Sequence, residues 1–149
     1  MEEKSAFDSF ELEVNEEIKG FLKETSSWTY FLSIIGFIGL GFMVLGGVVM
    51  SFAGNFNKFP GDIAYGVGYS VGVGLAYVFF ALIYFFPILY LFKFSKNIKK
   101  ALSLNNNDNL KMAFSSLKSH YKYMGIFVIV IISLYILIII GALAGASFL

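Results

Sequence analysis

Three long stretches of this chain carry no charged residue, and they limit its possible folds more than any other feature. They cover residues 25–57, 63–92 and 123–149 and are 33, 30 and 27 residues long by the numbering. A helix needs about 20 mostly apolar residues to cross the roughly 30 Å hydrocarbon core of a bilayer. Hydrophobic residues make up 58% of the chain and charged residues 14%, whereas soluble domains are nearer half and a quarter. The sequence therefore predicts an all-α integral membrane protein with three transmembrane helices, at about residues 28–53, 63–92 and 124–148.

The lysines are placed unevenly around these spans. The connection between the first and second spans holds a single lysine, Lys58. Short lysine-rich connections remain on the cytoplasmic side of a membrane. We therefore expect a cytoplasmic N-terminus and an outside C-terminus. The expected basic cytoplasmic surface consists of the lysines between the second and third spans: Lys93, Lys96, Lys99, Lys100, Lys111, Lys118 and Lys122.

The parts outside the predicted spans favour amphipathic cytoplasmic helices. Residues 1–24 have apolar side chains at helical spacing, eight acidic residues and three lysines, whereas residues 93–122 have seven lysines and one acid. We therefore expect an acidic helix at 1–24 and a membrane domain at 25–149. Within that domain, residues 93–122 predict a helical hairpin, with Asn107 or Asp108 as the cap of its second helix. Three interpretations stay open: the acidic helix docks on the basic hairpin, the lysines meet anionic lipid headgroups, or both faces are only solvated.

The segment YGVGYSVGVG, residues 65–74, has glycines spaced much as in a dinucleotide-binding loop. Such a loop needs a strand before it and an acidic residue about 20 positions later. No Asp or Glu occurs between Asp62 and Asp108, so no cofactor is expected. In a helix, residues four apart share nearly one face, and small residues there let a second helix approach closely. We therefore expect helix packing, within the chain or between copies, at Gly68, Gly72 and Ala76, at Gly47 and Ser51, and at Gly141 and Gly145.

The chemistry-bearing residues are few. Pro87 removes the hydrogen bond to the carbonyl of Ile83 and is expected to kink the second span. His120 is the only histidine and cysteine is absent, so we expect no metal site and interpret His120 as a solvated interfacial residue. The predicted spans hold no Asp, Glu, His, Lys or Arg, which disfavours a coupled transporter. No pattern of nucleophile and base indicates an enzyme, and nothing points to nucleic acid or a small-molecule ligand.

Two segments of the chain resemble a known family. They are FLKETSSWTYFLSIIGFIGLGFMV, in which Trp28 enters a glycine-rich span, and FSKNIKKALSLNNNDNLKMAFSSLKSHYKYMGI, which contains the predicted hairpin. Both are similar to an uncharacterised family of small bacterial multi-pass membrane proteins, described only as a domain of unknown function. The resemblance covers about residues 21–124 and implies a bacterial inner membrane. It implies no activity, ligand or catalytic residue.

The function expected from the sequence is that of a non-enzymatic membrane scaffold or accessory subunit. It would lie in the lipid bilayer and assemble with itself or with another membrane protein through its small-residue faces. The alternative is a small passive channel or transport component that acts as an oligomer. In that case Ser70, Tyr77 and Tyr84 of the second span would line a polar path.

Overall fold

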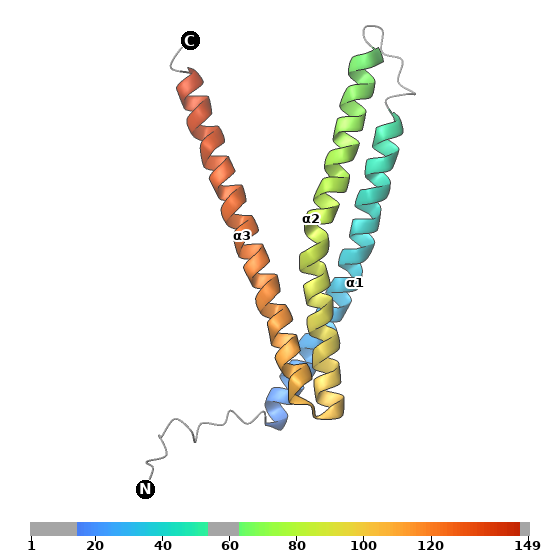
Figure 1. Ribbon diagram of the computed structural model, residues 1–149, viewed down its shortest axis with the longest axis vertical. Helices are drawn as coiled ribbons and strands as arrows, with labels where there is room; N and C mark the ends of the chain where they lie inside the picture. Colours follow the sequence, from blue (N-terminus) through green and yellow to red (C-terminus); the bar gives the residue numbers. More distant parts are fainter. Residues whose placement is uncertain (1–14, 54–62, 147–149) are drawn as a thin grey trace.

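The computed structural model describes residues 15–53 and 63–146, with side-chain surroundings for 15–52 and 68–144, and these residues form three long helices (Figure 1). α1 extends over Glu16–Ala53, α2 over Ile63–Leu104 and α3 over Asn107–Ala146. All three are long and apolar enough to cross a membrane, and the described part of the chain contains no strand. The predicted all-α fold with three membrane-spanning helices is therefore confirmed.

The helices continue well beyond the apolar spans at the end where α2 turns into α3, which we call the turn end. α1 begins at Glu16, so the last part of the expected acidic helix runs into the first span without a break, while residues 1–14 lie outside the described part. Residues 93–122 are the last turns of α2 and the first turns of α3 rather than two separate short helices. No proline follows Pro87, so nothing in the sequence breaks either helix between its apolar and lysine-rich halves.

Two asparagines make the turn between α2 and α3. Asn105 has a positive φ of 47°, a left-handed conformation that asparagine tolerates better than most residues. The N–H of Asn106 donates to the carbonyl of Ala101 at 3.1 Å, which is the bond of a Schellman ending. The Oδ1 of Asn106 accepts from the N–H groups of Asp108 and Asn109 at 2.8 and 3.2 Å. Asn106 is therefore the cap of α3, and the prediction of Asn107 or Asp108 was wrong by one or two positions because adjacent asparagines look alike in sequence.

A seven-residue repeat joins α1 and α2, which run antiparallel (Figure 1). The buried described residues of α1 are seven positions apart: Ser26, Ser33, Leu40 and Gly47. Buried or half-buried residues of α2 follow the same spacing: Gly74, Ala81, Ile88 and Ser95. In a left-handed helix pair every seventh residue returns to the same side, so this spacing keeps one face of each helix against the other. We call these eight residues the seven-residue seam.

The seam is held at both ends by close backbone contact. At the turn end the Ser95 hydroxyl donates to the carbonyl of Ser26 at 2.6 Å, and both side chains are buried. At the far end a Cβ atom added to Gly47 would lie 2.8 Å from the carbonyl oxygen of Gly74. A Cβ added to Gly74 would overlap with Ser51 Oγ and with the carbonyl oxygen of Gly47. Gly47 and Ser51 therefore lie at a helix contact, as expected, and their partner is Gly74.

The other expected packing residues do not take part in this contact. Nothing lies within 4 Å of a Cβ added at Gly68, Gly72 or Gly141, and Ala76 is exposed. Residues two apart on a helix point about 200° from each other, so α1 covers the side of α2 with Gly74 and not the side with Gly72. The in-chain alternative is therefore wrong for these four residues, and a contact between copies stays a prediction. The surroundings of Gly145 lie outside the described residues.

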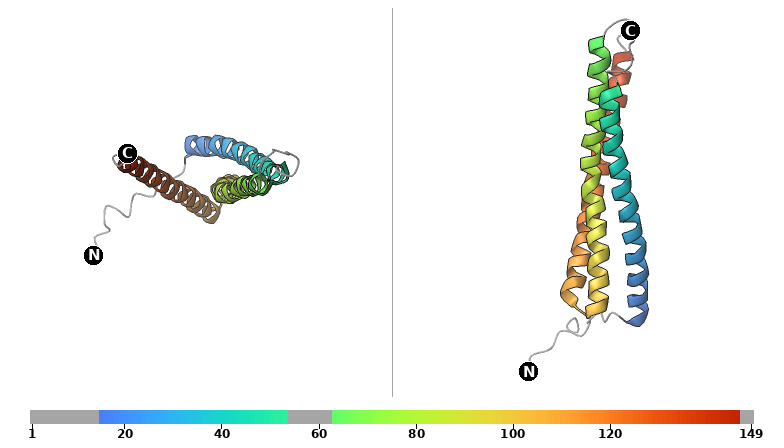
Figure 2. Two further views of the ribbon diagram at one scale, coloured as in Figure 1. Left: turned by 90° about the horizontal axis from the view of Figure 1, so that it is seen from above. Right: turned by 90° about the vertical axis from the view of Figure 1, so that its right-hand side faces the viewer.

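α3 packs on a different side of α2 and only near the turn end (Figure 2). Phe94 and Ile98 of α2 and Ala113 of α3 form a small buried core there, with Leu22 of α1 packed against it. Farther along, α3 diverges from α2 (Figure 1), and every described side chain from Val128 to Ala144 is exposed. The molecule is thus a closed α1–α2 pair with α3 attached at one end.

Two matched substitutions test the seam. Gly74→Leu should destabilise the α1–α2 pair by roughly 2 kcal/mol or more, because the new side chain meets the Gly47 backbone, which cannot rotate away. Gly72→Leu gains the same helix propensity but faces open space, so it should be as stable as wild type or more stable by up to about 1 kcal/mol. Unfolding of the monomer in mixed detergent micelles measures both. Equal stability of the two variants would contradict the seam.

Candidate functional site

The seven predicted surface lysines all lie at the turn end and are all exposed, on the last turns of α2 and the first turns of α3. The ammonium groups of two of these lysines lie over the faces of aromatic rings. Lys96 Nζ lies 5.1 Å from the centroid of the Phe92 ring, and Lys99 Nζ lies 4.3 Å from that of Tyr30 on α1. Cation–π contacts of this kind contribute about 0.5–1 kcal/mol at exposed sites. Lys99 is therefore directed from α2 across to α1.

An open cleft of about 480 Å³ lies between the first turns of α1 and the last turns of α2. Its charged lining consists of Glu16, Lys19 and Lys23 from α1 and Lys99 from α2, and we call it the basic cleft. Three ammonium groups thus meet one carboxylate. The sequence did not indicate this grouping, because Lys99 is remote from the other three and reaches them only through the antiparallel pairing of α1 and α2.

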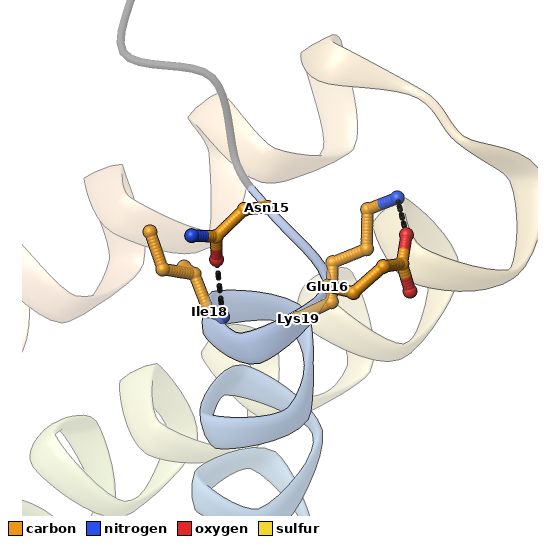
Figure 3. Close-up of polar contacts among 4 residues, drawn as sticks. All are labelled: Asn15, Glu16, Ile18 and Lys19. Carbon is orange, nitrogen blue, oxygen red and sulfur yellow. Dashed lines mark hydrogen bonds and ion pairs between the residues drawn. The ribbon is translucent and has the colours of Figure 1, made fainter.

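The start of α1 fixes the geometry of the basic cleft (Figure 3). Asn15 Oδ1 accepts from the N–H of Ile18 at 2.9 Å, a typical N-cap contact that begins the helix at Glu16. Lys19 Nζ donates to Glu16 Oε1 at 2.6 Å, which is the only ion pair among the described residues. Since Glu16 is engaged by Lys19, the charges of Lys23 and Lys99 have no ion-pair partner within the described part. Docking of residues 1–14 on the hairpin lies outside the described residues and stays a prediction.

A second polar site joins α2 to α3 at Pro87. Because proline has no N–H, the carbonyl of Ile83 loses its usual helical partner. The Tyr123 hydroxyl donates to this carbonyl at 3.0 Å. One helical turn away, Nδ1 of His120 lies 3.0 Å from the carbonyl oxygen of Pro87, where it can donate a second hydrogen bond. We call Ile83, Pro87, His120 and Tyr123 the proline latch.

The latch corrects the interpretation of His120 as a solvated residue. His120 is half-buried, and its ring is directed to the backbone of α2. The signal available in the sequence was the freed carbonyl of Ile83, but no spacing rule connects it to residues about 40 positions later. Among the described residues, no group of three or more His, Asp or Glu side chains is placed to hold a metal ion.

Two tyrosines of the second span, Tyr77 and Tyr84, lie at helix contacts. The rings of Tyr84 and Phe127 of α3 are edge to face with centroids 5.6 Å apart, and the Cβ of Tyr77 lies beside Gly47 of α1. Ser70 is half-buried. Tyr77 and Tyr84 therefore contact different neighbouring helices.

These features define an all-α protein with three helices able to cross a membrane and a lysine-rich end. A family model described as a family of unknown function (DUF5362) matches residues 50–143, and the chain belongs to this family. The match takes in α2 and nearly all of α3 but begins after Trp28, so it lies closer to the C-terminus than the range of 21–124 expected from the sequence. No curated protein and no solved structure matches the chain.

A double-mutant cycle tests the proline latch. Tyr123→Phe should cost about 1 kcal/mol, because it leaves the Ile83 carbonyl without a donor. In a Pro87→Ala background the N–H of residue 87 can serve that carbonyl, so the same change should cost much less. Unfolding in detergent micelles measures both costs.

Tyr121→Phe is the matched control for this cycle, because Tyr121 is 68% exposed. Its cost should be near zero in both backgrounds. An equal cost of Tyr123→Phe with and without Pro87 would show that the hydroxyl does not serve the freed carbonyl.

Proposed function

We propose that this protein is a non-enzymatic membrane scaffold or accessory subunit that assembles through the face of α2 with Gly68, Gly72 and Ala76. The observation that carries the proposal is that this face has no neighbour among the described residues of its own chain, although it has the four-residue spacing of small residues typical of helix association in lipid. Without a hydrophobic driving force between helices in lipid, close backbone contact is what favours association.

The orientation follows from the charges at the turn end. Seven exposed lysines and the start of α1 lie at this end, and α3 ends at the other (Figure 1). By the preference of lysine-rich segments for the cytoplasmic side, the turn end is cytoplasmic and the C-terminus is outside. The proposed location is the inner membrane of a bacterium, as the resemblance to small bacterial membrane proteins implies.

The bare surface of α3 supports an assembling role. Every described side chain beyond Phe127 is exposed, including Leu134, Leu137 and Ile138. Lipid can cover these side chains, and so can a helix of another subunit. A chain whose third helix packs along only about half its length leaves more of its surface available to partners than a closed bundle does.

Self-association in vesicles tests the proposal. Energy transfer between labelled copies should report an oligomer, and Gly72→Leu should weaken it by about tenfold or more, because leucine holds the two backbones apart. Gly39→Leu is the matched control: it places the same side chain in equally open space on α1 and should leave association unchanged.

If the wild-type protein does not self-associate, a membrane protein that co-purifies with it and is lost in Gly72→Leu would support the accessory role. Absence of both self-association and such a partner would overturn the proposal. Solute flux through vesicles that contain the purified protein, abolished by Tyr77→Phe, would replace it with the channel alternative.

A further inference from the structure

One flank of the seven-residue seam combines lysines at the turn end with aromatic and apolar side chains farther along. Residues seven apart keep the same orientation toward the partner helix. One further seven-residue repeat on α1 and one on α2 therefore line a continuous strip beside the seam. We call this strip the flanking groove. On α1 it consists of Lys23, Tyr30, Phe37 and Val44, and on α2 of Lys99, Phe92, Phe85 and Val78.

The groove is polar only at the turn end. There it opens into the basic cleft, which both Lys23 and Lys99 line. Next come the stacked rings of Tyr30 and Phe92, with centroids 5.6 Å apart, and then the tilted rings of Phe37 and Phe85, with centroids 6.0 Å apart. Lys99 Nζ packs on the Tyr30 ring, so the charged and aromatic parts are in direct contact.

The far part of the groove is an open apolar cleft of about 510 Å³. Phe37, Leu40 and Val44 of α1 and Val78 and Phe85 of α2 contribute to its walls, and no charged or hydroxyl side chain lines it. From Lys23 to Phe37, at the near end of this cleft, the helix rises by about 21 Å, close to the depth of one leaflet with its headgroups. A charged end followed by a long apolar strip matches the shape of a membrane lipid.

We propose that the flanking groove binds a single anionic phospholipid, with the phosphate in the basic cleft and an acyl chain along the aromatic and apolar strip. Lysine ammonium groups bind phosphate as point charges, and basic pockets between membrane helices suit lipid headgroups. A soluble phosphate ester would leave the apolar cleft unused. A second copy of the chain would have to bring acidic groups to Lys23 and Lys99. This inference does not depend on the proposed assembly through Gly72.

Quenching by brominated lipid tests the site on the full chain. The single tryptophan is moved into the groove by combining Trp28→Phe with Phe37→Trp. The protein is placed in phosphatidylcholine vesicles with a minor fraction of dibrominated phosphatidylglycerol or, separately, of dibrominated phosphatidylcholine. The apparent affinity of the Phe37→Trp site for the anionic lipid should exceed that for the zwitterionic lipid by about fivefold or more, the effect of one lysine near the headgroups.

Two controls separate this site from general attraction to the lysine-rich end. Ile35→Trp lies about 3 Å from the same depth, on an exposed side of α1 away from the groove, and should show no such preference. Lys23→Gln with Lys99→Gln should abolish the preference at Phe37→Trp. Lys118→Gln with Lys122→Gln, an equal loss of charge outside the basic cleft, should leave it unchanged.

Four results would overturn the proposal. The first is equal quenching by the two lipids at Phe37→Trp. The second is a preference for the anionic lipid that survives the loss of Lys23 and Lys99. The third is displacement of the anionic lipid by soluble glycerol phosphate, which would assign the basic cleft to free phosphate esters. The fourth is shielding of Phe37→Trp from both lipids, which would assign the groove to another protein helix.

Discussion

The close contact between α1 and α2 determines the arrangement of most other features of this structure. Small residues at Ser26, Gly47, Gly74 and Ala81 bring the two backbones together, and in lipid this proximity itself stabilises the pair. Because the repeat is seven residues long, the faces beside the seam also stay in register along the whole length. The basic cleft, the aromatic pairs and the apolar cleft all follow from that register.

The polar part of the attachment of α3 lies at Pro87 of α2. A proline in a membrane helix leaves a carbonyl that lipid cannot satisfy, and the cost must be met by a neighbouring group. Tyr123 supplies the missing donor, and His120 adds a contact to the next turn. In the described part of the chain, the side-chain hydrogen bonds between α2 and α3 are therefore concentrated around Pro87.

The sequence predicted the coarse fold well, because charge-free stretches report membrane spans directly. It also placed Gly47 and Ser51 at a contact. It did not reveal that Gly74, rather than Gly72, faces α1, because a four-residue spacing of glycines shows which residues could pack but not which face the neighbouring helix covers. Across the helices, the basic cleft and the latch join residues 33 to 83 positions apart, so only the tertiary arrangement of the helices reveals them.

Because α3 is attached at one end only, a small rotation at that end would move its free end by a large distance. About 35 Å of helix extends from Tyr123 to the end of α3 without packing against α2 beyond Phe127, and a helix of that length is stiff. A rotation of about 10° at Pro87 would therefore move the free end by roughly 6 Å, the width of half a helix. A change in the hydrogen bonds of His120 and Tyr123 that rotated α3 would therefore have its largest effect at the free end of the helix.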